Sequence, residues 1–323
     1  MKKSYTLSLA FLILISQQLS SQSLSLVKDL NTKPLSLSFI NSTGTQWQPS
    51  NTLIYFDGTD NKGQTLWRTD GTGEGTYSLS SPAIFSNYRI PFGDHSLLFD
   101  GADLFEGYEL WISDGTQAGT HLLKDIFKGR ESSYPGNFIS VSGTVFFKAY
   151  TPVYGEELYK TDGTKQGTVL VKDLEPGPNS SYPIYKFDSP GVNAGALNGK
   201  LIFSASTSQT GRELFISDGT ATSTVLLKDL YGSMESDPHA FVNLDGALYF
   251  LANKLDSVFL WKTDGTSAGS VQVSYLPATN LVVNNGKIYC SATDNSHGSE
   301  LWISDGTSAG THLLVDINPG PAR

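Results

Sequence analysis

Six aspartates recur along the chain in the same short motif, Asp-Gly-Thr, at intervals of 41 to 56 residues. Carboxylate oxygens suit calcium, but calcium needs several of them converging from one loop, and no Asp-x-Asp-x-Asp run occurs. An aspartate here also accepts hydrogen bonds from its own turn, while the glycine takes a positive φ. The sequence therefore favours structural turns over metal sites at Asp70, Asp114, Asp162, Asp218, Asp264 and Asp305.

A glutamate precedes a Leu-aromatic pair in four copies of the motif. A ring of such acids around a central channel would bind a cation or a sugar. The alternative is that each glutamate hydrogen-bonds to the neighbouring repeat. Because a binding site needs only one copy of a residue, the repetition favours the structural role for Glu109, Glu157, Glu213 and Glu300. The Lys-Asp pairs at Lys124, Lys172 and Lys228 are predicted to form a solvated outer strand edge, where charge discourages edge pairing.

The histidines and the cysteine form no recognisable catalytic motif. The chain contains no Gly-x-Ser-x-Gly elbow, no His-Glu-x-x-His, no phosphate loop and no dinucleotide fingerprint. His121 and His312 share a repeat position with tyrosine and valine, which predicts packing residues, and Cys290 is predicted to be a small buried residue. His95, His239 and His297 stand isolated in predicted loops. We therefore predict no catalytic residue, no metal site and no cofactor.

Irregular loops carry two further kinds of side chain, and loops are where function usually lies. The fold could bring two loop acids together as the catalytic pair of a glycoside hydrolase. The candidates are Asp94, Asp103, Glu106, Asp237 and Asp294. Tyrosines on loops suit recognition of carbohydrate or protein. Those in the linkers and loops are Tyr134, Tyr150, Tyr154, Tyr182 and Tyr185, and the longest irregularity is the insertion at 189–196.

The repeats that position these side chains each read as four strands. In the third repeat the strands are expected at 137–141, 144–149, 157–161 and 169–174. A tight turn separates the first two strands, and Asn198-Gly199 or Asp245-Gly246 at this place in other repeats is a strong hairpin signal. Each unit is thus predicted to be an up-and-down meander.

Apolar residues fall on both faces of each predicted sheet. Leu110 and Trp111 are adjacent, so they point to opposite sides of the strand. A sheet that is apolar on both faces is covered on both faces, as in a radial stack of four-stranded sheets. This predicts an all-β protein, a β-propeller of about six four-stranded blades, with a linear β-solenoid as the alternative. The repeats are placed near 31–81, 82–126, 127–174, 175–230, 231–276 and 277–317.

The repeat resembles the ELWxxDGT-repeat family of secreted bacterial proteins. The fullest matches cover 109–126, 157–174, 213–230 and 300–317, whereas the first repeat has Thr65 and the fifth has Phe259 in place of glutamate. The resemblance implies export, often by the type IX system, and implies no activity. No C-terminal sorting domain of that family is visible.

The two ends of the chain carry separate signals. Lys2 and Lys3, followed by the apolar run at 7–15, predict a signal peptide over 1–21 that precedes a repeat domain over 22–323. Residues 25–30 match the last strand of a repeat, and 318–321 match the start of one. These matches predict a larger ring of which this chain is a truncated part, the alternative being a ring of six blades.

Charge and composition limit the classes of partner that the protein is expected to bind. The chain has 22 Lys and Arg against 31 Asp and Glu, a net charge of −9, which disfavours nucleic acid and an anionic membrane surface. No further segment is long and apolar enough to span a membrane after signal removal. The favoured function is a secreted or cell-surface, non-enzymatic binding or adhesion module for a protein or glycan ligand. The alternatives are an extracellular propeller hydrolase acting on polysaccharide and a structural spacer in a larger surface protein.

Overall fold

The computed structural model describes residues 27, 48–50, 52–60, 63–79, 84–103, 105–184, 193–232 and 234–320. Every regular element in these ranges is a β-strand. The predicted signal peptide, Tyr185, residues 189–192 and all of the predicted strand at 25–30 except Val27 lie outside the described residues. In the part of the chain that the structure describes, no helix has the length and apolar character needed to cross a membrane.

The strands form antiparallel sheets of four, numbered here in chain order. Sheet 1 contains β1 (Gln48–Ser50), β2 (Leu53–Asp60), β3 (Gly63–Thr69) and β4 (Tyr77–Ser78). Sheet 2 contains β5 (Ile84–Phe92), β6 (Ser96–Ala102), β7 (Glu109–Ser113) and β8 (His121–Lys124). Sheet 3 contains β9 (Gly136–Val141), β10 (Thr144–Thr151), β11 (Gly155–Thr161) and β12 (Val169–Lys172). Sheet 4 contains β13 (Ala194–Leu197), β14 (Lys200–Thr207), β15 (Gly211–Ser217) and β16 (Val225–Lys228).

Sheets 5 and 6 share one long strand. Sheet 5 contains β17 (His239–Leu244), β18 (Ala247–Lys254) and β19 (Ser257–Thr263), and sheet 6 contains β21 (Lys287–Asp294), β22 (Gly298–Ser304) and β23 (His312–Val315). Between them β20 (Val271–Asn284) pairs with β19 through its first half and with β21 through its second half. The predicted repeat boundary at Leu276 therefore falls inside a strand.

The strands predicted for the third repeat match the structure closely. The main difference is that β10 and β11 are longer than expected and pair as far as Thr151 and Gly155, which closes a tight turn where a loop was predicted. The last strand ends at Lys172, two residues early, because the chain leaves the sheet there toward the next repeat.

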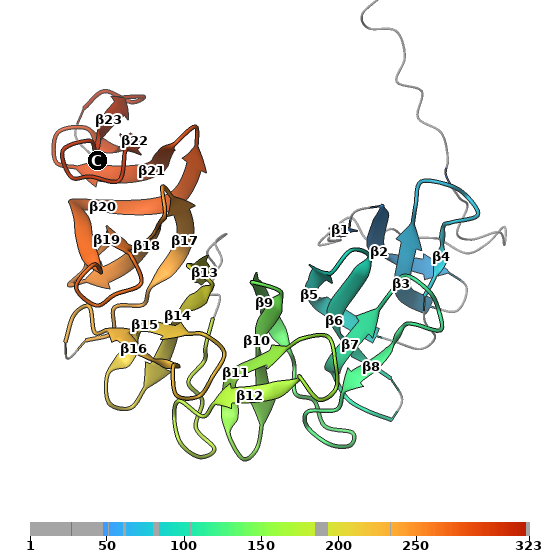
Figure 1. Ribbon diagram of the computed structural model, residues 1–323. Helices are drawn as coiled ribbons and strands as arrows, with labels where there is room; N and C mark the ends of the chain where they lie inside the picture. The colour runs from blue at the N-terminus through green and yellow to red at the C-terminus, as the bar shows by residue number, and fades with distance from the viewer. Residues whose placement is uncertain are drawn as a thin grey trace, which may run out of the picture.

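The six sheets stand side by side on an arc, which is the arrangement of a β-propeller (Figure 1). The first strands of successive sheets contact one another in the order β1, β5, β9, β13, β17 and β20, so these are the inner strands. Sheet 1, in blue, and sheet 6, in red, lie apart at the two ends of the arc. The described sheets thus form an open arc and not a closed ring of six.

Side chains from two sheets build each layer of the core. Leu110 in sheet 2 is fully buried against Phe147 and Tyr159 of sheet 3, whereas its neighbour Trp111 packs against Leu66 of sheet 1. The same pairing recurs along the arc, with the leucine of one sheet facing the aromatic residue of the next. The prediction that both faces of each sheet are covered is confirmed for sheets 2 to 5, whereas in sheet 6, at the end of the arc, Leu314 is 46 % exposed. Cys290 is also buried as predicted, in the second strand of sheet 6.

Candidate functional site

The two ends of the sheets carry different kinds of connection. Because antiparallel strands alternate in direction, the Asp-Gly-Thr turns and the first hairpin turns share one end. The loops between second and third strands and the linkers between sheets share the other end, which we call the linker face. Contacts between these segments confirm the grouping: Tyr150 at the end of β10 donates its backbone N–H to Ser133 O in the preceding linker, at 2.7 Å.

The Asp-Gly-Thr motif folds as a hydrogen-bonded turn, and Asp162 in sheet 3 shows the pattern. Its Oδ1 accepts hydrogen bonds from the backbone N–H of Thr164 at 2.9 Å and from the Thr164 hydroxyl at 2.7 Å. Gly163 has a φ of 83°, where glycine is favoured. Thr164 Oγ1 then accepts from Gly167 N at 2.9 Å, and Thr168 donates to Thr164 O at 2.7 Å. The aspartate thus organises the turn that leads into the fourth strand.

The six turn aspartates are exposed anions with a structural role. In each, the threonine hydroxyl and then the threonine backbone N–H lower the pKa of the carboxyl group, because both bonds favour the ionised form. Within the described ranges, no group of three or more His, Cys, Asp and Glu side chains is placed to hold a metal ion. The hydrogen bonds confirm the interpretation as turns.

The repeated glutamates are buried and tie each sheet to the linker that follows it. Glu109 accepts hydrogen bonds from the backbone N–H groups of Ile126 (2.8 Å), Phe127 (3.2 Å) and Ser133 (2.9 Å), and from the Ser133 hydroxyl (2.6 Å). Glu157 makes the equivalent four bonds, and Glu213 makes three. These contacts match the structural interpretation of the glutamates. Burial raises the pKa of Glu109, Glu157 and Glu213 to about 7, against the opposing effect of the donated bonds.

The Lys-Asp pairs lie on the edge strands of their sheets, as predicted, and their lysines also bond the next sheet. Lys172 Nζ donates to Thr224 O at 2.8 Å, in the turn of the next sheet, and Lys124 and Lys228 bond the following sheets in the same way. Their half-buried stems cross the gap between blades. The sequence did not predict this bond, because a single repeat does not reveal that its last strand lies beside the next repeat's turn.

Histidines 121 and 312 also differ from their prediction. Both side chains are exposed, and the valines at the same repeat position are exposed too, with Val225 at 43 %. The position lies on the outer strand and faces solvent, so the packing role is wrong. His95 lies 3.4 Å from Thr52 Oγ1, and His297 pairs with Asp294 at 2.8 Å.

The loop acids fall into separate pairs rather than one catalytic cluster. Asp103 and Glu106 share a hydrogen bond within one loop, which raises the pKa of Glu106, and Asp237 lies 3.7 Å from Arg212. Asp294 pairs with His297, as above. Asp94 lies in the first hairpin turn of sheet 2, at the opposite end of the sheets from the linker face.

Exposed aromatic side chains gather on the linker face of sheets 2 to 4. Tyr134 stacks on Tyr108 with ring centroids 5.7 Å apart, and Phe127 contacts Tyr150 at 6.0 Å. Such contacts fix the ring planes while leaving much of each ring accessible. The exposed members are Phe105 (70 %), Tyr134 (57 %), Tyr150 (38 %), Tyr154 (39 %) and Tyr182 (46 %). Phe105 was not among the predicted residues, since nothing in its local sequence marks an unburied phenylalanine.

Two of these tyrosines are held by the same unusual backbone. Tyr134 and Tyr182 have φ values of 48° and 46°, in the left-handed region that residues other than glycine seldom adopt. Each lies in a Ser-Tyr-Pro sequence in which the serine and proline are buried and the tyrosine is exposed. Ser133 and Ser181 are the serines bonded by Glu109 and Glu157. The buried glutamates therefore fix the linkers that present the tyrosines.

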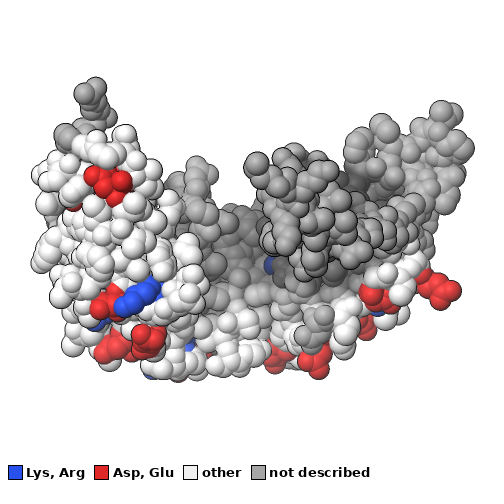
Figure 2. All heavy atoms as spheres, turned by 90° about the horizontal axis from the view of Figure 1, so that it is seen from above, with Lys and Arg blue, Asp and Glu red and all other residues white. Residues whose placement is uncertain are grey.

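Two ion pairs lie near the aromatic group. Lys148 forms an ion pair with Glu156 beside the β10–β11 turn, and Arg212 both approaches Asp237 and donates to Tyr182 O at 3.0 Å. In the view of Figure 2, Asp and Glu side chains form small separate groups, and the described residues show no continuous basic stripe. Beside Phe105 the surface carries the carboxyl groups of Asp103 and Glu106.

No protein-family model matches the chain, and no curated protein matches it by sequence. Its structure is similar to a prolyl endopeptidase (TM-score 0.50, 10 % identity, covering 84 % of this chain and 42 % of that one). It is also similar to an oligogalacturonate lyase in complex with manganese (0.46, 13 %, covering 83 % and 76 %). A third is the β-propeller domain of the Trilobed protease from Pyrococcus furiosus (0.44, 14 %, covering 85 % and 84 %). The chain spans less than half of the endopeptidase, and likeness at such identities shows the fold alone.

Proposed function

We propose that the protein is a secreted or cell-surface binding module that recognises neutral polysaccharide through its linker face. The observation that carries the proposal is the pair of Ser-Tyr-Pro linkers, in which an exposed tyrosine is fixed between two buried neighbours. The predicted signal peptide and the resemblance to a secreted repeat family support a place outside the cell.

Fixed, exposed tyrosines suit sugar rings. A sugar presents a face of C–H groups that stacks on an aromatic ring, and its hydroxyls bond the polar rim. Tyrosine supplies this contact area at a low entropic cost, since it has few rotatable bonds. Tyr134 and Tyr182 hold their backbone before binding, so less order has to be gained when a chain docks. Because the carboxyl groups of Asp103 and Glu106 lie beside Phe105, we expect a neutral polymer to be preferred over an acidic one.

The hydrolase alternative has weaker support on this face. Glycoside hydrolases hold two carboxyl groups about 5 to 9.5 Å apart, on opposite sides of the scissile bond. Asp103 and Glu106 are the acids beside Phe105, and they are hydrogen-bonded to each other, which leaves no room for a sugar between them. Hydrolysis and a ligand-free spacer role are therefore outcomes that the binding experiment must distinguish.

The test is a screen of the full chain on an array of neutral oligosaccharides, followed by affinity electrophoresis in gels containing the best matching polysaccharide. We expect retardation, and we expect Tyr134→Ala and Tyr182→Ala each to weaken it about tenfold by removing a stacking plane. His121→Ala, an exposed change on an outer strand, is the matched control and should bind as the parent does.

Three outcomes would overturn the proposal. The first is no retention on any neutral glycan, and the second is a Tyr134→Ala/Tyr182→Ala double variant that binds normally. The third is release of shorter sugars from the polysaccharide, because turnover would identify an enzyme. Circular dichroism of each variant separates lost binding from lost folding.

A further inference from the structure

The inner strands contain a bulge with a left-handed residue at the same repeat position. In β9 this residue is Asn137 (φ 55°), in β17 it is Ala240 (φ 55°) and in β20 it is Asn280 (φ 56°). In each strand the pairing with the next strand shifts register there. Asn137 and Ala240 both lie four residues after the serine that bonds a buried glutamate, so their equivalence is clear.

In sheet 3 this residue closes the gap to the next blade. Asn137 Nδ2 donates a hydrogen bond to Ile184 O at 2.8 Å, and Ile184 is the left-handed residue that precedes the inner strand of sheet 4. In sheet 5 the equivalent Ala240 has only a methyl group. It cannot make the corresponding bond to the Thr279 carbonyl of sheet 6, since Thr279 pairs with Ser291 as Ile184 bonds Ser204.

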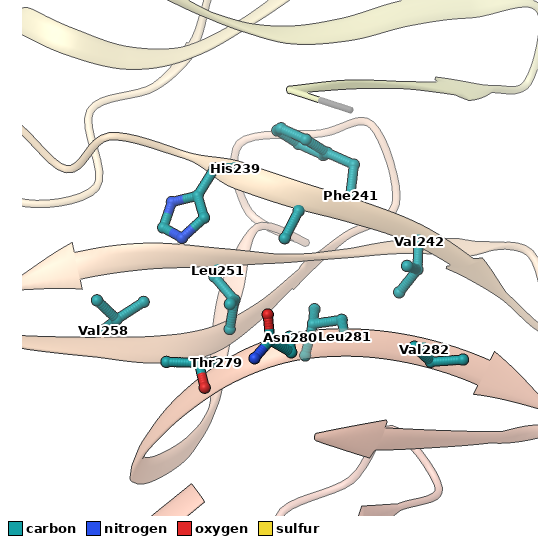
Figure 3. A pocket seen from close by; sticks show the side chains of 10 residues that line it. His239, Phe241, Val242, Leu251, Val258, Thr279, Asn280, Leu281 and Val282 are labelled. Carbon is teal, nitrogen blue, oxygen red and sulfur yellow. The ribbon is translucent and has the colours of Figure 1, made fainter. Parts of the chain in front are cut away.

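A pocket of about 230 Å³ lies at this position, between β17 and β20. His239, Leu251 and Val258 lie across from Thr279, Asn280 and Leu281 (Figure 3). The inner wall is deeply buried, with Leu251 1 % exposed, whereas the rim is open, with Val282 60 % exposed. Ala240 lines this pocket at the repeat position that Asn137 occupies in sheet 3.

The lining is largely aliphatic, with a few polar atoms at known places. None of the ten residues that line the pocket is Asp, Glu, Lys or Arg. His239 Nδ1 lies 2.7 Å from Asp237 O, and since a carbonyl only accepts, Nδ1 carries the proton. Nε2 of the neutral ring is then an acceptor, and Asn280 and Thr279 offer further polar groups.

Size and polarity select the ligand. A cavity of about 150 Å³ with an aliphatic lining holds benzene, so this one has room for a single substituted ring. A monosaccharide would bury several hydroxyls against Val242, Leu251 and Val258 without partners, at a cost for each. A phenol has one hydroxyl to satisfy, and His239 Nε2 can accept its hydrogen bond.

We infer that the pocket between β17 and β20 is a binding site for an uncharged phenolic ring, opened by the replacement of a bridging asparagine by Ala240. It lies between sheets 5 and 6, whereas the exposed tyrosines belong to sheets 2 to 4, so it is independent of the proposed polysaccharide binding. The ring can belong to a small phenol or to a tyrosyl side chain of a peptide.

The test titrates the full chain with p-cresol and with toluene, using isothermal calorimetry for affinity and Val/Leu methyl NMR for location. We expect p-cresol to shift the methyl signals of Val242, Leu251, Val258 and Leu281 and to bind at least tenfold more tightly than toluene, which lacks the hydroxyl. N-acetyl-tyrosinamide is the second probe: binding by it assigns a tyrosyl side chain, and binding by p-cresol alone assigns a small phenol.

Two variants fill the pocket from opposite sides. Ala240→Asn should build the bridge to Thr279 O, abolish p-cresol binding and raise the melting temperature by about 2 °C, because asparagine also favours positive φ. Val258→Phe should abolish binding without that bridge, so the test does not depend on one variant folding. Absence of methyl shifts with p-cresol, equal binding of toluene, or binding retained in both variants would overturn the inference.

Discussion

At the level of single residues, the buried glutamates and the exposed aspartates illustrate opposite effects of the same kind of contact. Each carboxylate accepts bonds from a serine or threonine hydroxyl and from backbone N–H groups. On the exposed Asp162 these bonds dominate and lower the pKa, whereas on Glu157 desolvation dominates and raises it to about 7. Repetition pointed to a structural role for both, but the partners of Glu157 lie up to 24 residues away, beyond any local pattern.

The raised pKa of the glutamates predicts a pH dependence of stability. Since the folded-state pKa lies above the ordinary value near 4.5, the contribution is fully present below pH 4.5 and is lost as pH rises through about 7. The free energy of unfolding in urea should therefore fall between pH 5 and pH 8. Each pKa unit corresponds to about 1.4 kcal/mol.

Glu157→Gln removes one of the three titrating groups, so it should reduce this fall, while the exposed change Glu131→Gln should leave it unchanged. A stability that rises from pH 5 to pH 8 in the parent would contradict the prediction. It would show that the four donors around Glu157 keep it ionised throughout.

At the level of elements, the turns were the feature most directly predicted from the sequence. Asp-Gly and Asn-Gly pairs identified the turns, because positive φ is a local requirement that few residues meet. A second glycine in the motif is required for a different reason. A Cβ on Gly167 would collide with the Asp162 carboxylate, and sheet 4 has Ser223 at this position instead. There the bond from Ser223 N to Thr220 Oγ1 lengthens to 3.3 Å, from 2.9 Å at Gly167.

This collision predicts coupling between two changes in one turn. Gly167→Ala alone should destabilise the protein by about 1–3 kcal/mol, because the carboxylate must move. Asp162→Ala alone should cost about 1 kcal/mol in lost hydrogen bonds. With both changes the clash is absent. The double variant should therefore be at least about 1 kcal/mol more stable than the sum of the two single-variant losses predicts. Urea unfolding of the four proteins measures the cycle, and simple additivity would refute the stated reason for the glycine.

At the level of the whole molecule, stability depends on contacts between consecutive sheets. Leu158 of sheet 3 is fully buried against Phe203 and Phe215 of sheet 4. Each sheet contacts chiefly its neighbours along the arc, as in repeat proteins generally. Apolar residues on both faces of each predicted sheet indicated this packing. They did not indicate that the arc is open, because the angle between blades depends on how the side chains of two sheets interlock.

Nearest-neighbour packing predicts that a core defect stays local. Leu158→Ala should cost about 2–5 kcal/mol and should speed amide exchange in β11 and β14, with β2 of sheet 1 little affected. Hydrogen-exchange mass spectrometry resolves these strands. Leu226→Ala, at a position 38 % exposed in β16, is the control and should change exchange little. Uniformly faster exchange across all sheets would instead indicate a single cooperative unit.

The sequence by itself determined the strand and turn types, the number of repeats and the burial of both sheet faces, because these follow from patterns within one repeat. Only the tertiary structure decided which surfaces are available for binding. Tyr134 stands exposed on a linker that Glu109 holds, and Ala240 of sheet 5 and Asn280 of sheet 6 line one pocket. Both depend on contacts between residues far apart in the chain, and the distances and facing of such residues are set only when the blades pack.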